Sequence, residues 1–231
     1  MKVLVTNLSG NVGKSTLAHH LLSPRMNDAK VISVESINSD GTEDETIRGK
    51  QFGEVLEVLP IYDDLIVDVG ASNIEDLLKM MRQYRGSHED FDYFVIPTTK
   101  EAKQMRDTIS TIDALSELKV PAKKIRLVFK MVEPEDNVEQ IFAGLFAYQE
   151  HEKKFVINSN AVLYNNAVFT KLKESNKTIK EVLSDETDHK ALLAQATTTA
   201  DKVELSRQIS LKRLCSGVIE ELDYVFKVLF K

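Results

Sequence analysis

The chain has 231 residues, of which 42% are hydrophobic and 29% charged, a composition that excludes wholesale disorder and fits one soluble globular domain. With 30 basic and 36 acidic residues, the formal net charge of −6 argues against an autonomous, strongly basic nucleic-acid binder. The single Cys215 cannot form an internal disulfide, which fits a reducing cytoplasm, and no apolar run approaches the roughly 18 residues of a membrane span.

Short apolar runs alternate with helical patterns along the first two thirds of the chain. Strands are predicted at 2–5, 31–34, 65–69, 93–97, 125–129 and 155–157, and helices at 15–22, 74–84, 102–118, 137–149 and 161–173. This alternation implies a mostly parallel sheet flanked by helices on both faces, a three-layer α/β/α arrangement. After about Thr178 the pattern is only helical. We expect one domain over 1–231, with a core over about 1–183 and a helical C-terminal region over about 184–231.

The segment after the first strand carries the clearest chemistry. Residues 7–16 read NLSGNVGKST and lead into a helical run at 17–22. Gly10 and Gly13 allow the backbone to pass close to phosphate oxygens. Lys14 supplies a charge for the β- and γ-phosphates, and the Ser15 hydroxyl is placed to ligate Mg²⁺. The pattern therefore predicts a phosphate-binding loop.

The match to the pattern GxxxxGK[ST] is incomplete, because Leu8 stands where the first glycine is expected. One alternative is a strand–turn–helix junction that merely contains Gly-Lys-Ser. Another is a Rossmann dinucleotide site in which Glu35, at the end of the second strand, holds a ribose. GxGxxG is absent, however, and Lys14 would have no role there. The place of the loop between an N-terminal strand and an amphipathic helix favours phosphate binding.

The segment 38–54 is polar and acidic and contains three glycines. Its composition predicts a solvated loop. Since it follows the second strand, a mobile loop close to a ligand is an equal alternative.

The apolar run 64–68 ends in Asp68, which is expected at the carboxyl edge of the sheet, beside the phosphate loop. There it would hold a Mg²⁺-bound water. The alternative is a capping role for the helix that begins near Asn73. Together with Lys14 and Ser15, the metal role is favoured.

These features resemble the ParA/MinD family of deviant Walker-type ATPases. In that family the loop reads roughly xKGGxGK[ST], and residues 9–15 occupy it in register. Asp68 as the Walker B-like carboxylate, the strand at 94–97 and the stretch 158–161 extend the resemblance over about 1–183.

The resemblance implies ATP and Mg²⁺ as cofactors. It assigns the metal to Ser15 and Asp68, catalysis to Lys14, Glu35 and Asp40, and nucleotide binding to Ser9, Gly10, Asn11, Val12, Gly13, Lys14, Ser15 and Thr16.

Two departures from the family pattern concern the chemistry. The family's signature lysine, which reaches the partner's nucleotide in the dimer, falls at Ser9. The second acid of the family's Asp-x-Asp falls at Ile37, so Glu35 or Asp40 is left to position the attacking water. Slow hydrolysis is the expectation. The family's base-reading Asn is not found at 129–131, and adenine is assigned by analogy.

The C-terminal region and the basic residues suggest partner surfaces. The family resemblance points to weak or indirect DNA contact through scattered basic residues, whereas the net charge favours solvated helix faces. The last helix, over 218–229, has its apolar residues on one face. Its acidic residues disfavour a membrane, and packing on the sheet or on a dimer partner is preferred. The basic residues concerned are Lys100, Lys103, Arg106, Lys171, Lys173, Lys177, Lys180, Arg207, Lys212 and Arg213.

The resulting hypothesis is an ATP–Mg²⁺-dependent molecular switch with weak ATPase activity, in plasmid segregation, stability and conjugative transfer. It would work as a homodimer with a plasmid-encoded DNA-binding protein, in the bacterial cytoplasm and at the nucleoid. Two alternatives remain open: a non-hydrolysing nucleotide-binding adaptor, and a small-molecule P-loop kinase.

Overall fold

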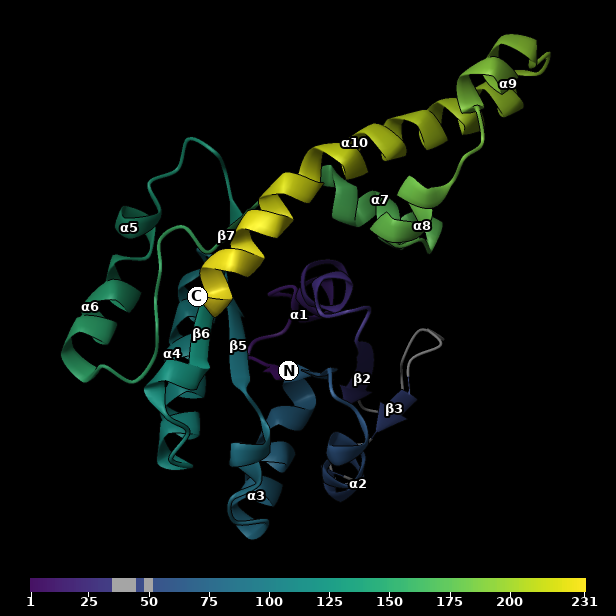
Figure 1. Cartoon of the computed structure of the whole chain (residues 1–231). Helices are drawn as coiled ribbons and strands as arrows, with labels where there is room; N and C mark the ends of the chain where they lie inside the picture. Colours follow the sequence, from purple (N-terminus) through teal and green to yellow (C-terminus); the bar gives the residue numbers. More distant parts are fainter. Residues whose placement is uncertain (35–44, 48–51) are drawn as a thin grey trace. The chain divides into compact units, whose positions relative to one another are not determined.

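A computed structural model of the chain describes residues 1–34, 45–47 and 52–231 (Figure 1). Contacts divide it into two compact units. The first comprises Met1–Asn165 together with Val225–Lys231, and the second comprises Asn166–Tyr224. The expected single domain with a core to about residue 183 stays a prediction.

The first unit is built on a parallel sheet. Within the described residues, seven strands pair in the order β3-β2-β4-β1-β5-β6-β7, and every pairing is parallel. All five residues of β4 are buried, and because alternate side chains point to opposite faces, both faces of this strand are covered. The predicted α/β class with a mostly parallel sheet is confirmed. The strands are β1 (Lys2–Val5), β2 (Lys30–Val34), β3 (Glu45–Ile47), β4 (Leu65–Val69), β5 (Tyr93–Thr98), β6 (Ile125–Val132) and β7 (Val162–Tyr164).

Helices alternate with these strands and then fill the second unit (Figure 1). The first unit holds α1 (Lys14–Thr16), α2 (Phe52–Val58), α3 (Ile74–Gln83), α4 (Ala102–Glu117), α5 (Val138–Ile141) and α6 (Ala143–Glu152). The π-helical segment η1 (Leu17–Leu22) continues α1, and short 3₁₀ turns are η2 (Ser23–Arg25), η4 (Leu59–Ile61), η5 (Ala71–Asn73), η6 (Ser87–Asp90) and η7 (Ala122–Lys124). The second unit holds α7 (Ala167–Ser175), α8 (Ile179–Ser184), α9 (His189–Gln195) and most of α10 (Thr199–Phe230).

The last strand of the sheet differs from the prediction. The stretch 155–157 forms only an isolated bridge, between Val156 and Arg126 of β6. The chain then turns at Asn158, whose side chain and carbonyl accept from the backbone N–H groups of Asn160 and Ala161. Pairing with β6 resumes at β7, where a helix beginning at 161 was expected. Asn166 caps α7 through its side chain, so the predicted helix begins about six residues later.

Two other segments also depart from expectation. The helix predicted at 137–149 is interrupted at Phe142, whose buried ring lies 4.4 Å from the ring of Phe129. The segment 38–54 is not a loop throughout, since it includes β3 and the start of α2. Its remaining residues lie outside the described part of the chain.

The apolar face predicted for the last helix is confirmed. Val218, Leu222, Val225 and Leu229 of α10 are each at most 3% exposed, at the three- and four-residue spacing of one helix face. Cys215 is also buried, as expected for a small apolar residue. None of the described helices combines the length and the apolar character needed to cross a bilayer.

Candidate phosphate-binding site

The predicted phosphate loop connects the central strand β1 to α1. β1 pairs with β4 on one side and with β5 on the other, so the loop leaves the sheet at its middle. Gly13 closes the loop with φ +82°, in the left-handed region, and the helix begins at Lys14. The Leu17 N–H donates to the Gly13 carbonyl at 3.1 Å, which continues the helical path into η1. The strand–loop–helix arrangement read from the sequence is therefore present.

Lys14 directs its charge into the loop. Its Nζ donates to the carbonyl oxygens of Ser9 at 2.8 Å and Asn7 at 3.3 Å, and the residue is 8% exposed. Because a buried ammonium needs acceptors, these carbonyls hold the amine inside the curve of the loop.

Hydrogen bonds to β5 and α4 hold the first half of the loop. The Asn7 Nδ2 donates to the Pro97 carbonyl and to the Thr108 Oγ1, both at 2.8 Å, and the Leu8 N–H donates to the Thr111 Oγ1 at 3.0 Å. Asn7, Thr108 and Thr111 are missing from the predicted site. Thr108 and Thr111 lie three residues apart on one face of α4, and both are fully buried. Buried hydroxyls at this spacing indicate hydrogen-bond partners in a neighbouring segment.

Ser9, at the position of the resembling family's signature lysine, bonds within its own chain. Its hydroxyl donates to the Asp107 carboxylate of α4, and its N–H donates to the Asn7 Oδ1 at 2.8 Å. The residue is 2% exposed. Ser9 therefore connects the loop to α4.

The other predicted loop residues differ in exposure. Gly10, Asn11 and Ser15 are exposed, Gly13 and Thr16 are half-buried, and Val12 is fully buried. Asn11 has φ +57°, a conformation that asparagine tolerates better than most residues. The exposed hydroxyl of Ser15, one residue after Lys14, is accessible to a metal ion.

Asp68 lies at the same edge of the sheet. In the parallel register it is paired with Val5, the last residue of β1, and with Ser33 of β2. It is 2% exposed. The sheet thus brings this carboxylate next to the strand that leads into the loop. The other two predicted acids, Glu35 and Asp40, lie outside the described residues.

Lys130 is a further residue of this region that the predicted site does not include. It lies on β6 and is 6% exposed. A Cβ added to Gly13 would lie 2.3 Å from its Nζ, so the amine covers the open side of that glycine. Burial lowers the pKa of Lys130 to about 8. A charged residue in the second, mostly apolar half of this strand is the sequence signal that was available.

The residues fit a phosphate group with a magnesium ion. Gly13 has no side chain, and the Lys130 amine lies over it. Lys14 supplies a buried charge, and Ser15 and Asp68 supply the oxygen ligands that Mg²⁺ prefers. Among the described residues, no group of three or more His, Cys, Asp and Glu is arranged to hold a metal.

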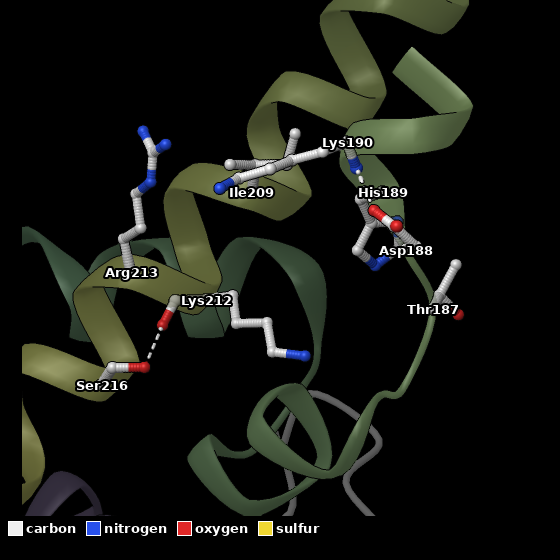
Figure 2. A pocket seen from close by; sticks show the side chains of 8 residues that line it. All are labelled: Thr187, Asp188, His189, Lys190, Ile209, Lys212, Arg213 and Ser216. Carbon is white, nitrogen blue, oxygen red and sulfur yellow. Dashed lines mark hydrogen bonds between the residues drawn. The ribbon is translucent and has the colours of Figure 1, made fainter. Parts of the chain in front are cut away.

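The second unit has a cavity of its own, of about 390 Å³ (Figure 2). Lys190, Lys212 and Arg213 line it together with His189, and none of the predicted nucleotide-site residues does. The His189 Nε2 lies 3.0 Å from the Asp185 carboxylate, and the Lys212 amine donates to the Asp185 carbonyl. Two of the basic residues considered for DNA contact, Lys212 and Arg213, therefore line one cavity.

Comparison with known proteins gives limited similarity. No protein-family model matches the chain, and no curated protein matches it. Among solved structures it is similar to apo McdA of Cyanothece, with 12% identity, 98% of this chain and 96% of that chain covered, and a TM-score of 0.49. A Cyanothece McdA variant in complex with ATP matches at 12% identity, with 96% of each chain covered and a TM-score of 0.48. The ParA protein of pNOB8 matches at 11% identity, with 98% of each chain covered and a TM-score of 0.45. The interpretation of the site rests on its own residues.

Proposed function

We propose that this protein is an ATP–Mg²⁺-dependent molecular switch of the ParA/MinD type, with slow ATPase activity. The observation that carries this proposal is the loop between β1 and α1, in which Gly13 has a left-handed backbone and the Lys14 amine is held by the loop carbonyls. A bare backbone beside a buried lysine at the start of a helix is suited to a polyphosphate.

We infer the roles of the site residues from the loop and from the family resemblance. Residues 9–16 surround the phosphates, with Lys14 neutralising the charge that develops on the γ-phosphate during transfer. Ser15 and Asp68 would hold the magnesium ion. The ion supplies Lewis-acid neutralisation of the phosphate oxygens when it is bound. Glu35 or Asp40 positions the attacking water, and Lys14 with either acid makes up the catalytic set.

Slow hydrolysis follows from the surroundings of Ser9. A serine hydroxyl bonded to Asp107 of the same chain brings no positive charge to a neighbouring subunit's nucleotide. Loss of such a charge costs orders of magnitude in phosphoryl transfer. The same observation favours a second candidate, an adaptor that binds nucleotide without hydrolysing it.

The biological role is inferred from the loop sequence. Within the ParA/MinD family, the phrase NLSGNVGKST followed by Pro24 most resembles the plasmid stability protein StbB. We infer a role in plasmid segregation, stability and conjugative transfer. Nucleotide state would control homodimer assembly and binding of a plasmid-encoded DNA-binding protein, because loops held by a γ-phosphate relax when it is lost. Direct DNA contact would be weak.

ATP turnover and oligomeric mass test this proposal. Wild type should hydrolyse ATP slowly in a Mg²⁺-dependent manner, and Lys14→Ala should lower turnover by at least about a hundredfold, the scale of losing one charge-stabilising group. Lys123→Ala, at an exposed lysine before β6, is the matched control and should leave turnover unchanged.

The outcomes separate the candidates. ATP binding with no turnover under any condition, including added DNA and partner, would exclude the ATPase switch and support the non-hydrolysing adaptor. Turnover stimulated only by a small metabolite would indicate a P-loop kinase. ATP-dependent dimerisation that is lost in Lys14→Ala supports the switch.

A further inference from the structure

Lys130 reaches the phosphate loop from a strand that is distant in sequence. β6 pairs with β5, and β5 pairs with β1, so its carboxyl end lies two strands from the start of the loop. The Lys130 Nζ lies 2.3 Å from the place where a Gly13 Cβ would be, and its Cδ and Cε lie 3.0 Å from that place. The last carbons of the side chain and its amine thus occupy the side of Gly13 that has no side chain.

A β-bulge accompanies this placement. The register between β6 and β7 shifts between Lys130 and Val132, and Met131, the residue between them, has φ +56° and is 50% exposed. Bulges reorient side chains and are frequent beside functional sites. Here Lys130 and Val132 are buried while Met131 faces solvent.

The charge of Lys130 is costly in this position. Burial favours the neutral amine, and the pKa of Lys130 falls to about 8, so the side chain still carries its proton at neutral pH. His20 of η1 faces the same charge. Burial, the charge of His19 and then the charge of Lys130 lower the pKa of His20 to about 4, so this imidazole is neutral at pH 7. A buried, charged amine over the bare backbone of a phosphate loop is suited to an anion bound there.

We propose that Lys130 is a second phosphate-binding cation of this site, supplied in cis by β6 and acting beside Lys14. The proposal rests on the proposed function in that the natural ligand is a nucleoside triphosphate. The chemistry recognised is the polyphosphate, and the base is not involved. Two amines, that of Lys14 within the loop and that of Lys130 from β6, would share the negative charge of the phosphate chain.

Binding measurements with ATP, adenosine and inorganic pyrophosphate test this assignment. By titration calorimetry, Lys130→Met should weaken ATP and pyrophosphate binding by about tenfold to a hundredfold, the scale of one charged hydrogen bond. Adenosine binding should stay the same. Lys130→Arg, which keeps the charge, should recover part of the loss. Lys123→Met is the matched control at an exposed lysine, and thermal unfolding confirms that each variant is folded.

The outcomes are distinguishable from those of the proposed function. Pyrophosphate binding that depends on Lys130, in a protein that does not hydrolyse ATP, supports the assignment while the ATPase proposal fails. Unchanged pyrophosphate and ATP affinity in Lys130→Met overturns the assignment and leaves the switch intact. Equal losses for ATP and adenosine also overturn it, because they would place Lys130 against the base. Wild type that binds neither phosphate ligand overturns both.

Discussion

Gly13 is the residue of the loop where a side chain is least tolerable. Its φ of +82° disfavours any L-residue by roughly 1–2 kcal/mol, and a Cβ would collide with the Lys130 amine. Gly13→Ala should therefore lower the free energy of unfolding of the nucleotide-free protein by at least about 1–2 kcal/mol, measured by urea denaturation followed by circular dichroism. Gly10→Ala is the control, because no atom lies within 4 Å of its added Cβ. Equal midpoints for the two variants would contradict this expectation.

The buried charge of Lys130 should appear in the pH dependence of stability. Its pKa is about 8 in the folded chain and 10.5 without burial, so between these values the unfolded state binds more protons and stability rises with pH. The charge costs up to about 3 kcal/mol at pH 7, at 1.36 kcal/mol per pKa unit. His20, which faces Lys130 and titrates near pH 4, adds nothing in this range.

Lys130→Met should therefore be more stable than wild type at pH 7, by about 1–3 kcal/mol. This advantage should shrink as pH rises through 8 towards 10.5, because wild type then folds with a neutral amine. Urea unfolding at pH 7 and pH 10 measures both differences, and Lys123→Met should show neither. A stability gain that is constant over this range would indicate an apolar packing effect in place of a charge effect.

At the scale of elements, α4 acts as the support of the phosphate loop. Thr108 of α4 accepts from Asn7, and Thr111 accepts from the Leu8 N–H. Thr108→Val keeps the shape but leaves the Asn7 amide one acceptor short in a buried place, which costs about 1–3 kcal/mol. We expect a matching loss in the free energy of unfolding and weaker ATP binding. Ser110→Ala, on the exposed face of the same helix, should change neither. If Thr108→Val were destabilised but bound ATP with unchanged affinity, α4 would stabilise the fold without contributing to ATP binding.

The sequence predicted most elements of the sheet because their strands are short and mostly apolar. β1, β2, β4 and β5 fall within one residue of the expected bounds. β7 was mistaken for the start of a helix, because three residues are too few to show a period. The pairing of Val162 with Phe129 is set by the turn at Asn158, which no local pattern reveals.

The site was predictable only where its residues are adjacent in the chain. Gly13, Lys14 and Ser15 form a local motif, and Asp68 ends an apolar strand at a recognisable edge. Lys130 lies 117 positions after Gly13, and Thr108 lies 101 positions after Asn7, so both reach the loop only through tertiary packing. A single sequence does not show which residue of β6 lies beside the loop. The only local signal for Lys130 is a charged residue in a strand that is expected to be buried.

On the scale of the whole molecule, α10 belongs to both units. It begins in the second unit, and its last residues belong to the first, where the Phe230 ring lies 4.8 Å from the ring of Tyr93. Tyr93 is in register with Val3 of β1, the strand that leads into the phosphate loop. The C-terminal residues are therefore part of the structure that carries the loop.

Leu229→Ala tests this connection. Leu229 is 3% exposed, and truncation of a buried leucine costs about 2–5 kcal/mol, whereas Lys227→Ala at an exposed position of the same turn should cost little. The loss should appear as a lower thermal midpoint of unfolding of the first unit. It should also appear as faster hydrogen exchange of the backbone amides of β1 and β5. ATP at a hundred times its Kd should raise the free energy of unfolding by about 2.7 kcal/mol, since a ligand that binds only the folded state stabilises it by mass action. If Leu229→Ala sped up hydrogen exchange only at the amides of 199–224, the end of α10 would not stabilise the sheet. The phosphate loop would then not depend on the end of α10.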